Sequence, residues 1–224
     1  MNLKNFITFG FSVAAAATMM VGSANADTIV LNVNFDGTIA GDVYTLGAGE
    51  VDTTGTLTGF GSPAVAGGEA DLAGDGTIHQ GFEIDPGAIV GQNWVAESLV
   101  SFDAFSGGQL TVISVQGDTA FRINFGGTDL EANYWDGATS GTVNNGSLPA
   151  IGTEIHLALA WDATATSMTA YVNGVSIGVV DNEAYAIPDA TNLSFGYFGR
   201  STFDNRGIDG QLSGIAFSTY DNAF

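Results

Sequence analysis

Two short stretches of the sequence place a glutamate and an aspartate two residues apart, a spacing that puts both carboxylates on one face of a β-strand. They are Glu83-Ile84-Asp85 and Glu69-Ala70-Asp71. Retaining glycosidases need such a pair, because two carboxyl groups about 5 to 5.5 Å apart must flank the sugar. Asp85 directly precedes Pro86 in a segment typical of a turn, so the first pair is not expected to lie on one regular strand.

The histidines and acidic loops give weaker indications of a catalytic or metal site. His79 and His156 are too far apart in the sequence for a local zinc motif, whereas a Ser/His/Asp arrangement stays open on spacing alone. The segment that begins at Asp71 starts like a calcium-binding EF-hand loop. It lacks the acidic third position, however, and has Phe82 where the bidentate glutamate should stand. We therefore reject the EF-hand interpretation.

A better candidate for ligand binding combines aromatic and amide side chains. Tyr134, Trp135 and Asp136 stand at the end of an expected strand beside a long polar loop over residues 138–150, which contains Asn144 and Asn145. Aromatic rings stack on the apolar faces of sugars, and carboxylates and amides bond to sugar hydroxyls. These five residues are the predicted carbohydrate-binding site. The alternative interpretation is that Trp135 belongs to the core and that the loop is merely solvated.

The charge balance limits the classes of partner. Residues 1–26 have the features of a secretory signal peptide, with Lys4, an apolar run and a small-residue cleavage site, although a membrane anchor is the alternative. Export and cleavage would leave one domain over residues 27–224, with three arginines, 24 acidic residues and a net charge of −21. That charge disfavours nucleic acid, anionic lipid and polyanionic glycans as partners, but not neutral glycans. Arg122, inside an expected strand, suits a buried carboxylate as well as a ligand.

The residue pattern predicts an all-β chain. Glycine is abundant, with 32 residues, and apolar residues alternate with polar ones over short runs bounded by turn residues. Residues 37–76 are expected to form loops with brief strands. Longer strands are expected at residues 28–35, 77–84, 94–105, 110–115, 120–125, 130–135, 155–161, 168–180, 193–198 and 211–217.

The hairpin within residues 168–180 permits a prediction of register. Asn173-Gly174 is the dipeptide best suited to a two-residue type I′ turn. Such a turn would pair Val172 with Val175, Ala170 with Ile177, and Met168 with Val179. Every cross-strand pair on one face would then be apolar, so that face is expected to lie on the core of a two-sheet sandwich.

The order of the motifs resembles the laminin-G-like branch of the concanavalin A-like lectin/glucanase superfamily. The matching segments are an N-terminal strand ending in Phe-Asp-Gly, a central aromatic strand, a His-x-Ala strand, a Tyr-Val-x-Gly hairpin, a Gly-rich strand and a closing Asp-Gly strand. In this chain they are Phe35-Asp36-Gly37, residues 94–105, His156-Leu157-Ala158, Tyr171-Val172-Asn173-Gly174, residues 195–200 and Asp209-Gly210-Gln211-Leu212. The resemblance implies an antiparallel two-sheet jelly-roll sandwich with a concave face.

The resemblance also carries expectations about metal and catalysis. It implies a structural Ca²⁺ site at Asp36 and the Gly37 carbonyl, near Asp209 if the first and last strands are neighbours; plain turn aspartates are the alternative. Retaining glucanases of this superfamily carry a third carboxylate on the same strand face, where this chain has Gly87 or Ala73. No catalytic residue is therefore predicted, and His156 is expected to be a structural hydrogen-bonding residue.

Three functions follow from these observations, since this fold hosts lectins, adhesion modules and glycosidases alike. The favoured prediction is a secreted, non-catalytic module that binds neutral carbohydrate, with a structural calcium ion. A self-associating structural or adhesive protein of the cell surface or matrix is the second, and a glycoside hydrolase is the third.

Overall fold

The computed structural model describes residues 28–74, 79–87, 92–105, 109–115, 119–123, 128–135, 140–181, 192–197 and 206–221. Within these residues the chain forms strands and no helix, and all strand pairs are antiparallel. The predicted all-β sandwich is confirmed. In the described part of the chain, no helix has the length and apolar composition required to cross a membrane. The predicted signal peptide lies outside the described residues.

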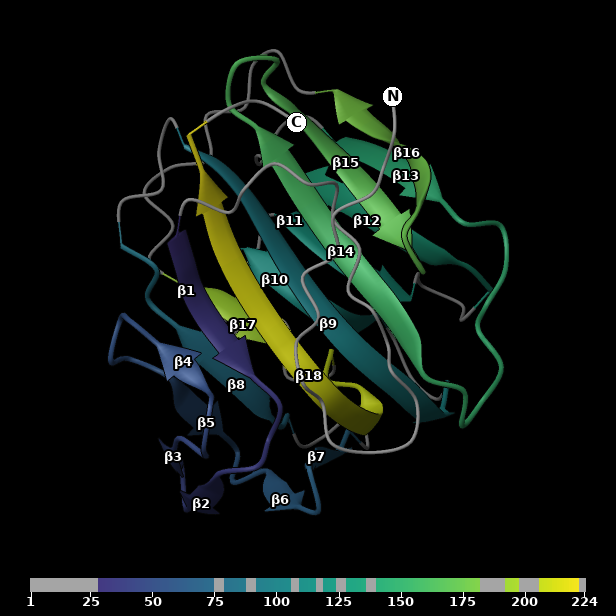
Figure 1. The fold of residues 1–224 in the computed structure, drawn as a ribbon. Helices are drawn as coiled ribbons and strands as arrows, with labels where there is room; N and C mark the ends of the chain where they lie inside the picture. The colour runs from purple at the N-terminus through teal and green to yellow at the C-terminus, as the bar shows by residue number, and fades with distance from the viewer. Residues whose placement is uncertain are drawn as a thin grey trace.

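The strands form two sheets, which Figure 1 shows as two layers. Sheet A has the order β16-β15-β14-β9-β18-β1-β4, with β7 paired to β18 and β6 paired to β7. Its strands are β1 (Thr28–Val33), β4 (Val51–Asp52), β6 (Ala64–Ala66), β7 (Glu69–Ala73), β9 (Asn93–Ala104), β14 (Ile155–Asp162), β15 (Ser167–Val172), β16 (Val175–Asp181) and β18 (Asp209–Tyr220).

Sheet B lies behind sheet A in Figure 1 and has the order β13-β12-β11-β10-β17-β8-β5-β3-β2. Its strands are β2 (Thr38–Ala40), β3 (Val43–Thr45), β5 (Thr58–Phe60), β8 (Gly81–Ile84), β10 (Leu110–Val115), β11 (Thr119–Ile123), β12 (Leu130–Trp135), β13 (Ser140–Asn144) and β17 (Leu193–Phe195).

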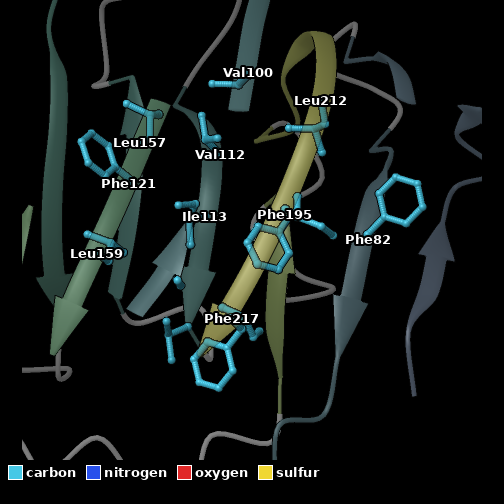
Figure 2. Close-up of a cluster of buried hydrophobic side chains, with 14 of the residues drawn as sticks. Phe82, Val100, Val112, Ile113, Phe121, Leu157, Leu159, Phe195, Leu212 and Phe217 are labelled. Carbon is cyan, nitrogen blue, oxygen red and sulfur yellow. The ribbon is translucent and has the colours of Figure 1, made fainter. Parts of the chain in front are cut away.

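Alternation along the strands builds one core between the sheets. The even-numbered residues of β9 from Trp94 to Phe102 are fully buried, as the sequence pattern predicts. Figure 2 shows Phe82, Ile113, Phe121 and Phe195 of sheet B facing Leu157, Leu159, Leu212 and Phe217 of sheet A. Burial of a side chain of this size contributes about 1.5–3 kcal/mol, so these facing layers hold the two sheets together.

The hairpin β15–β16 confirms the predicted turn and corrects the predicted register. Asn173 and Gly174 have φ values of 50° and 75°, and Val172 pairs with Val175. Beyond that pair the ladder shifts by one residue, so Ala170 lies opposite Gly178 instead of Ile177, and Met168 lies opposite Val180 instead of Val179. The prediction was wrong there because it assumed a regular ladder, whereas a β-bulge adds one residue to β16.

Gly178 explains why the bulge is tolerated. Its φ is 152°, and a Cβ atom there would lie 2.9 Å from Cγ1 of Val143 on β13. The absence of a side chain thus lets the edge of sheet A approach the edge of sheet B. The segment 138–150, predicted as a long loop, accordingly contains strand β13, which pairs with β12 along its whole length.

Candidate functional site

The outer face of sheet B carries a row of mostly polar residues, interrupted at Ala120 on β11. Because Phe82, Ile113, Phe121 and Phe195 point into the core, their strand neighbours point outward. The register aligns these neighbours across seven strands, from β5 to β13. Six spacings of about 4.8 Å make the row about 29 Å long, a length that suits an extended ligand. Its polar members are Thr58, Glu83, Ser194, Ser114, Asn133 and Thr142.

A second outward row runs beside the first and contains an ion pair. Thr111, Arg122, Glu131 and Asn144 lie opposite one another on β10, β11, β12 and β13. Arg122 Nε donates to Glu131 Oε1 at 2.7 Å. Burial lowers the pKa of Arg122, and the bond to Glu131 opposes that change. Arg122 therefore holds a buried carboxylate, which is one of the two roles considered for it.

Several oxygen atoms in these rows are buried without a hydrogen-bond partner among the described residues. They are Thr111 Oγ1, Ser114 Oγ and Asn133 Oδ1. Thr111 and Ser114 have no exposed surface, and Asn133 is 6% exposed. A buried polar atom without a partner costs about 1–3 kcal/mol, and these atoms have almost no surface that a ligand on the outer face could reach.

Glu83 lies in the first row and is held by two residues that come late in the chain. Its Oε2 atom accepts hydrogen bonds from Asn192 Nδ2 at 2.8 Å and from the hydroxyl of Tyr197. Burial raises the pKa of Tyr197, and the neighbouring Glu83 carboxylate raises it further, so the phenol remains a donor over the physiological range. Both bonds go to Oε2, and no described residue donates to Oε1.

The ring of Tyr197 also builds an aromatic stack on this face. It lies parallel to Phe60, with centroids 4.8 Å apart and planes 6° apart, and Phe60 is 39% exposed. Phe60 pairs with Gly81, where a Cβ atom would lie 2.6 Å from Cδ1 of Tyr197 and 2.2 Å from the Phe195 carbonyl oxygen. Gly81 thus leaves the space in which the tyrosine ring crosses β8.

The structure separates the residues of the predicted carbohydrate site. Trp135 and Tyr134 stand near the end of β12, opposite Ser140 and Gly141. Asn144 lies opposite Glu131 at the other end of the hairpin, about 13 Å away, and the backbone N–H of the following asparagine, Asn145, donates to the Leu130 carbonyl. Asp136 lies outside the described residues. Among the four described residues, the two asparagines therefore lie away from Tyr134 and Trp135, and Asn144 joins the second outward row instead.

The predicted calcium donors do not converge either. The predicted site required the first and last strands to be neighbours, and they are, because β1 pairs with β18. However, β7 continues the same edge of β18 beyond β1. Asp36, which follows β1, therefore lies by Gly68, just before β7 begins. Asp209 instead pairs with Ala73, at the other end of β7. The length of β7 separates the two aspartates by about 15 Å. Among the described residues, no three acidic or histidine side chains gather as a metal site.

A glutamate that sequence reasoning missed holds the Phe35-Asp36-Gly37 turn. Glu50 Oε1 accepts from the backbone N–H groups of Asn34 and Asp36, each at 3.0 Å, and Oε2 accepts from Gly47 N at 2.5 Å. The Tyr44 hydroxyl lies 3.0 Å from both oxygens. Glu50 is a carboxylate in a glycine-rich stretch with few other charges, and that isolation was the signal available in the sequence.

The turn itself needs this support. Phe35 adopts a left-handed φ of 60°, which is unusual for a large side chain. Its ring is buried against Phe82, at a centroid distance of 4.8 Å, and against Tyr44 at 6.0 Å. Burial raises the pKa of Tyr44, with Glu50 adding to that effect. The Phe-Asp-Gly segment is thus fixed by core packing on one side and by one carboxylate on the other.

The remaining candidates have structural contacts. Asp85 Oδ1 accepts from Gly87 N and closes the expected turn, while Glu69 and Asp71 are exposed on β7. His156 Nε2 lies 3.1 Å from Glu97 Oε1, and its backbone N–H donates to Asn173 Oδ1. These bonds join β14 to β9 and to the β15–β16 turn.

Comparison with models of protein families identifies the family of this chain. Residues 75–221 match the laminin-G-like model of the concanavalin A-like lectin/glucanases superfamily. The chain belongs to this superfamily. The match begins before β8 and ends just after β18, so the strands that build both outward rows of sheet B, apart from β5, lie within it. No curated protein matches the chain.

Solved structures share the fold of this chain at low identity. Trypanosoma rangeli sialidase in complex with sialic acid has 14% identity and a TM-score of 0.62, covering 91% of this chain and 32% of the sialidase. The chain thus spans about a third of that enzyme. The Emp47p carbohydrate recognition domain has 8% identity and a TM-score of 0.57, covering 88% and 100%.

A third structure is also close in length to this chain. Domain 4 of AbnA, a GH43 extracellular arabinanase from Geobacillus stearothermophilus, in complex with arabinotriose, has 15% identity and a TM-score of 0.51. The similarity covers 86% of this chain and 92% of that domain. At these identities the comparisons establish the sandwich fold.

Proposed function

We propose that this protein is a carbohydrate-binding module without hydrolytic activity, and that its ligand lies on the outer face of sheet B. The observation that carries the proposal is the outward polar row, in which Thr58 and Thr142 are exposed and Glu83 is half-buried with one oxygen to which no described residue donates. Sugar hydroxyls donate and accept hydrogen bonds, and they would bond to such side chains. The lectins of the superfamily, a carbohydrate recognition domain and an arabinotriose complex among similar folds support the same class of ligand.

Hydrolysis would require a second carboxylate near Glu83. On the outer face of sheet B, Glu131 is four strands away, or about 19 Å, and it is bonded to Arg122. That distance exceeds the separation of about 5 to 9.5 Å used by glycosidases. Asp85, the nearest carboxylate along the chain, closes its own turn. Binding without turnover is therefore the proposal that the described carboxylates support.

The direct experiment is a screen of immobilised polysaccharides with the chain lacking residues 1–26, in the presence of calcium and of EDTA. Neutral glycans are the expected ligands, in view of the charge of −21. Because the predicted calcium donors are separated, we expect binding to survive EDTA. Silence across neutral and acidic glycans would refute the proposal, and release of reducing sugar would refute the absence of hydrolysis. Export with loss of residues 1–26 is tested by N-terminal sequencing of protein recovered outside the cytoplasm.

Self-association is a second candidate, favoured by one edge of sheet A. The edge strand β16 exposes Val175 and Val179 by 67% and 49%. An exposed edge with apolar side chains can pair with another chain. Light scattering of the wild type and of a Val175→Lys, Val179→Lys variant distinguishes the two functions, because only an edge-mediated assembly would dissociate in the variant.

A further inference from the structure

Glu83, Thr58 and Phe60 combine features that a sugar subsite needs, and they lie at one end of the outward polar row. The Glu83 carboxylate is fixed through Oε2 by two donors, which leaves Oε1 as an acceptor. Thr58 on β5 is exposed, and its hydroxyl oxygen is a second acceptor. Because Thr58 pairs directly with Glu83, the two acceptors are neighbours on one face of the sheet.

Two adjacent acceptors select a ligand that presents two adjacent donors. In an uncharged sugar these donors are hydroxyl groups on neighbouring ring carbons. The negative charge of Glu83 disfavours a sugar carboxylate at the same place, because the two anions would repel each other. The charge on the site therefore points to a neutral unit with a vicinal diol.

The aromatic stack supplies the apolar part of the subsite. Phe60 is held against Tyr197, which in turn bonds to Glu83, so the ring and the carboxylate are positioned by one residue. Thr58 is exposed on the same face of β5 and lies directly opposite Glu83. A pyranose ring has an apolar face that packs on an aromatic ring while its hydroxyls point to polar groups alongside.

We propose that Phe60, Glu83 and Thr58 form a subsite for a neutral pyranose unit, in which the Glu83 and Thr58 side-chain oxygens accept hydrogen bonds from a vicinal diol. This inference rests on the proposed carbohydrate-binding function. Tyr197 is a positioning residue, because it fixes the carboxylate and supports Phe60. The rest of the outward row would contact further units of the same glycan.

The test measures affinity for the best polysaccharide from the screen by calorimetry, with melting curves to check that each variant folds. Glu83→Gln should weaken binding about tenfold or more, since a bond to a charged acceptor is lost. Phe60→Ala should weaken it about five- to tenfold, and Phe60→Tyr should restore it. Glu69→Gln, on exposed β7, and Ile151→Ala, at an exposed apolar residue, are matched controls that should bind as the wild type does.

Periodate provides a readout that a purely structural role would not affect, because it cleaves vicinal diols. Treatment of the polysaccharide should abolish binding, and a neutral polysaccharide whose linkages leave no neighbouring hydroxyls should not bind. If the wild type binds neutral glycan and both Glu83→Gln and Phe60→Ala bind equally well, the subsite is refuted while the proposed function stands. Binding confined to carboxylated sugars refutes the neutral class, and no glycan binding at all refutes both proposals.

Discussion

Replacement of Glu50 by glutamine tests whether one carboxylate holds the Phe35-Asp36-Gly37 turn. The glutamine oxygen can still accept from the backbone N–H groups of Asn34 and Asp36. The new amide N–H groups, however, would face the N–H of Gly47, which now donates to Oε2 at 2.5 Å. The variant thus loses a charge-assisted bond and sets two donors against each other.

The expected cost follows from these contacts. A hydrogen bond to a charged group contributes about 1.5–3 kcal/mol, and an unsatisfied donor adds to the loss, so we expect about 3 kcal/mol less unfolding free energy. In a domain of this size that corresponds to a fall in Tm of about 6–12 °C. Calorimetric and urea unfolding of wild type and Glu50→Gln measure it, with Glu69→Gln as the control for loss of one exposed negative charge.

The same experiment separates the carboxylate from a metal. If the turn were held by calcium at Asp36, EDTA would lower the Tm of the wild type by as much as the Glu50 substitution does. We expect EDTA to leave the Tm unchanged. A loss below about 0.5 kcal/mol in Glu50→Gln would refute the reasoning, because such a value is typical of an ordinary surface substitution.

Three further predictions concern glycines and a tyrosine. Gly81→Ala should lower stability by about 1–3 kcal/mol and also weaken glycan binding, because the new methyl group would collide with the Phe195 carbonyl and the Tyr197 ring; normal melting and binding would contradict this. Gly178→Ala should lower stability by a similar amount, and Val143→Ala in the same chain should recover part of it, which a double-mutant cycle measures. The raised pKa of Tyr197 means that its contribution is complete below the unfolded tyrosine value of 10.0 and is lost as pH rises above it. Urea midpoints should therefore fall above that pH, and Tyr197→Phe should make the fall shallower; identical slopes would exclude this role.

Sequence patterns predicted the strands that face the core and missed those that depend on a partner. Trp94 to Phe102 alternate so regularly that the buried face of β9 could be assigned from the residues alone. Strand β13 offers only Val143 among polar residues, so it resembled a loop, and its pairing with β12 decides its structure. The bulge in β16 was signalled only by Gly178, since a turn fixes the register only while the ladder stays regular.

The candidate site was harder to predict than the fold. Glu83 stood out as a carboxylate and was considered only as a catalyst, because its neighbours in sequence say nothing of Tyr197 and Asn192. Those residues lie 114 and 109 positions further along the chain. Single-sequence reasoning detects local spacing, and here the chemistry arises from contacts between distant strands. The separation of Asp36 from Asp209 could not be predicted for the same reason. Knowing that the first and last strands are neighbours does not tell which of their ends lie side by side.

The position of β18 has a consequence for how the chain folds. This strand of 12 residues pairs with β9 on one edge and with β1 and β7 on the other. These three earlier strands therefore lack their main partner until nearly the whole chain has been synthesised. The loop from Thr28 to Thr219 must close, at a cost in chain entropy, before the pairing of β1 with β18 can stabilise the sheet. We infer that sheet A forms late and that the chain folds slowly.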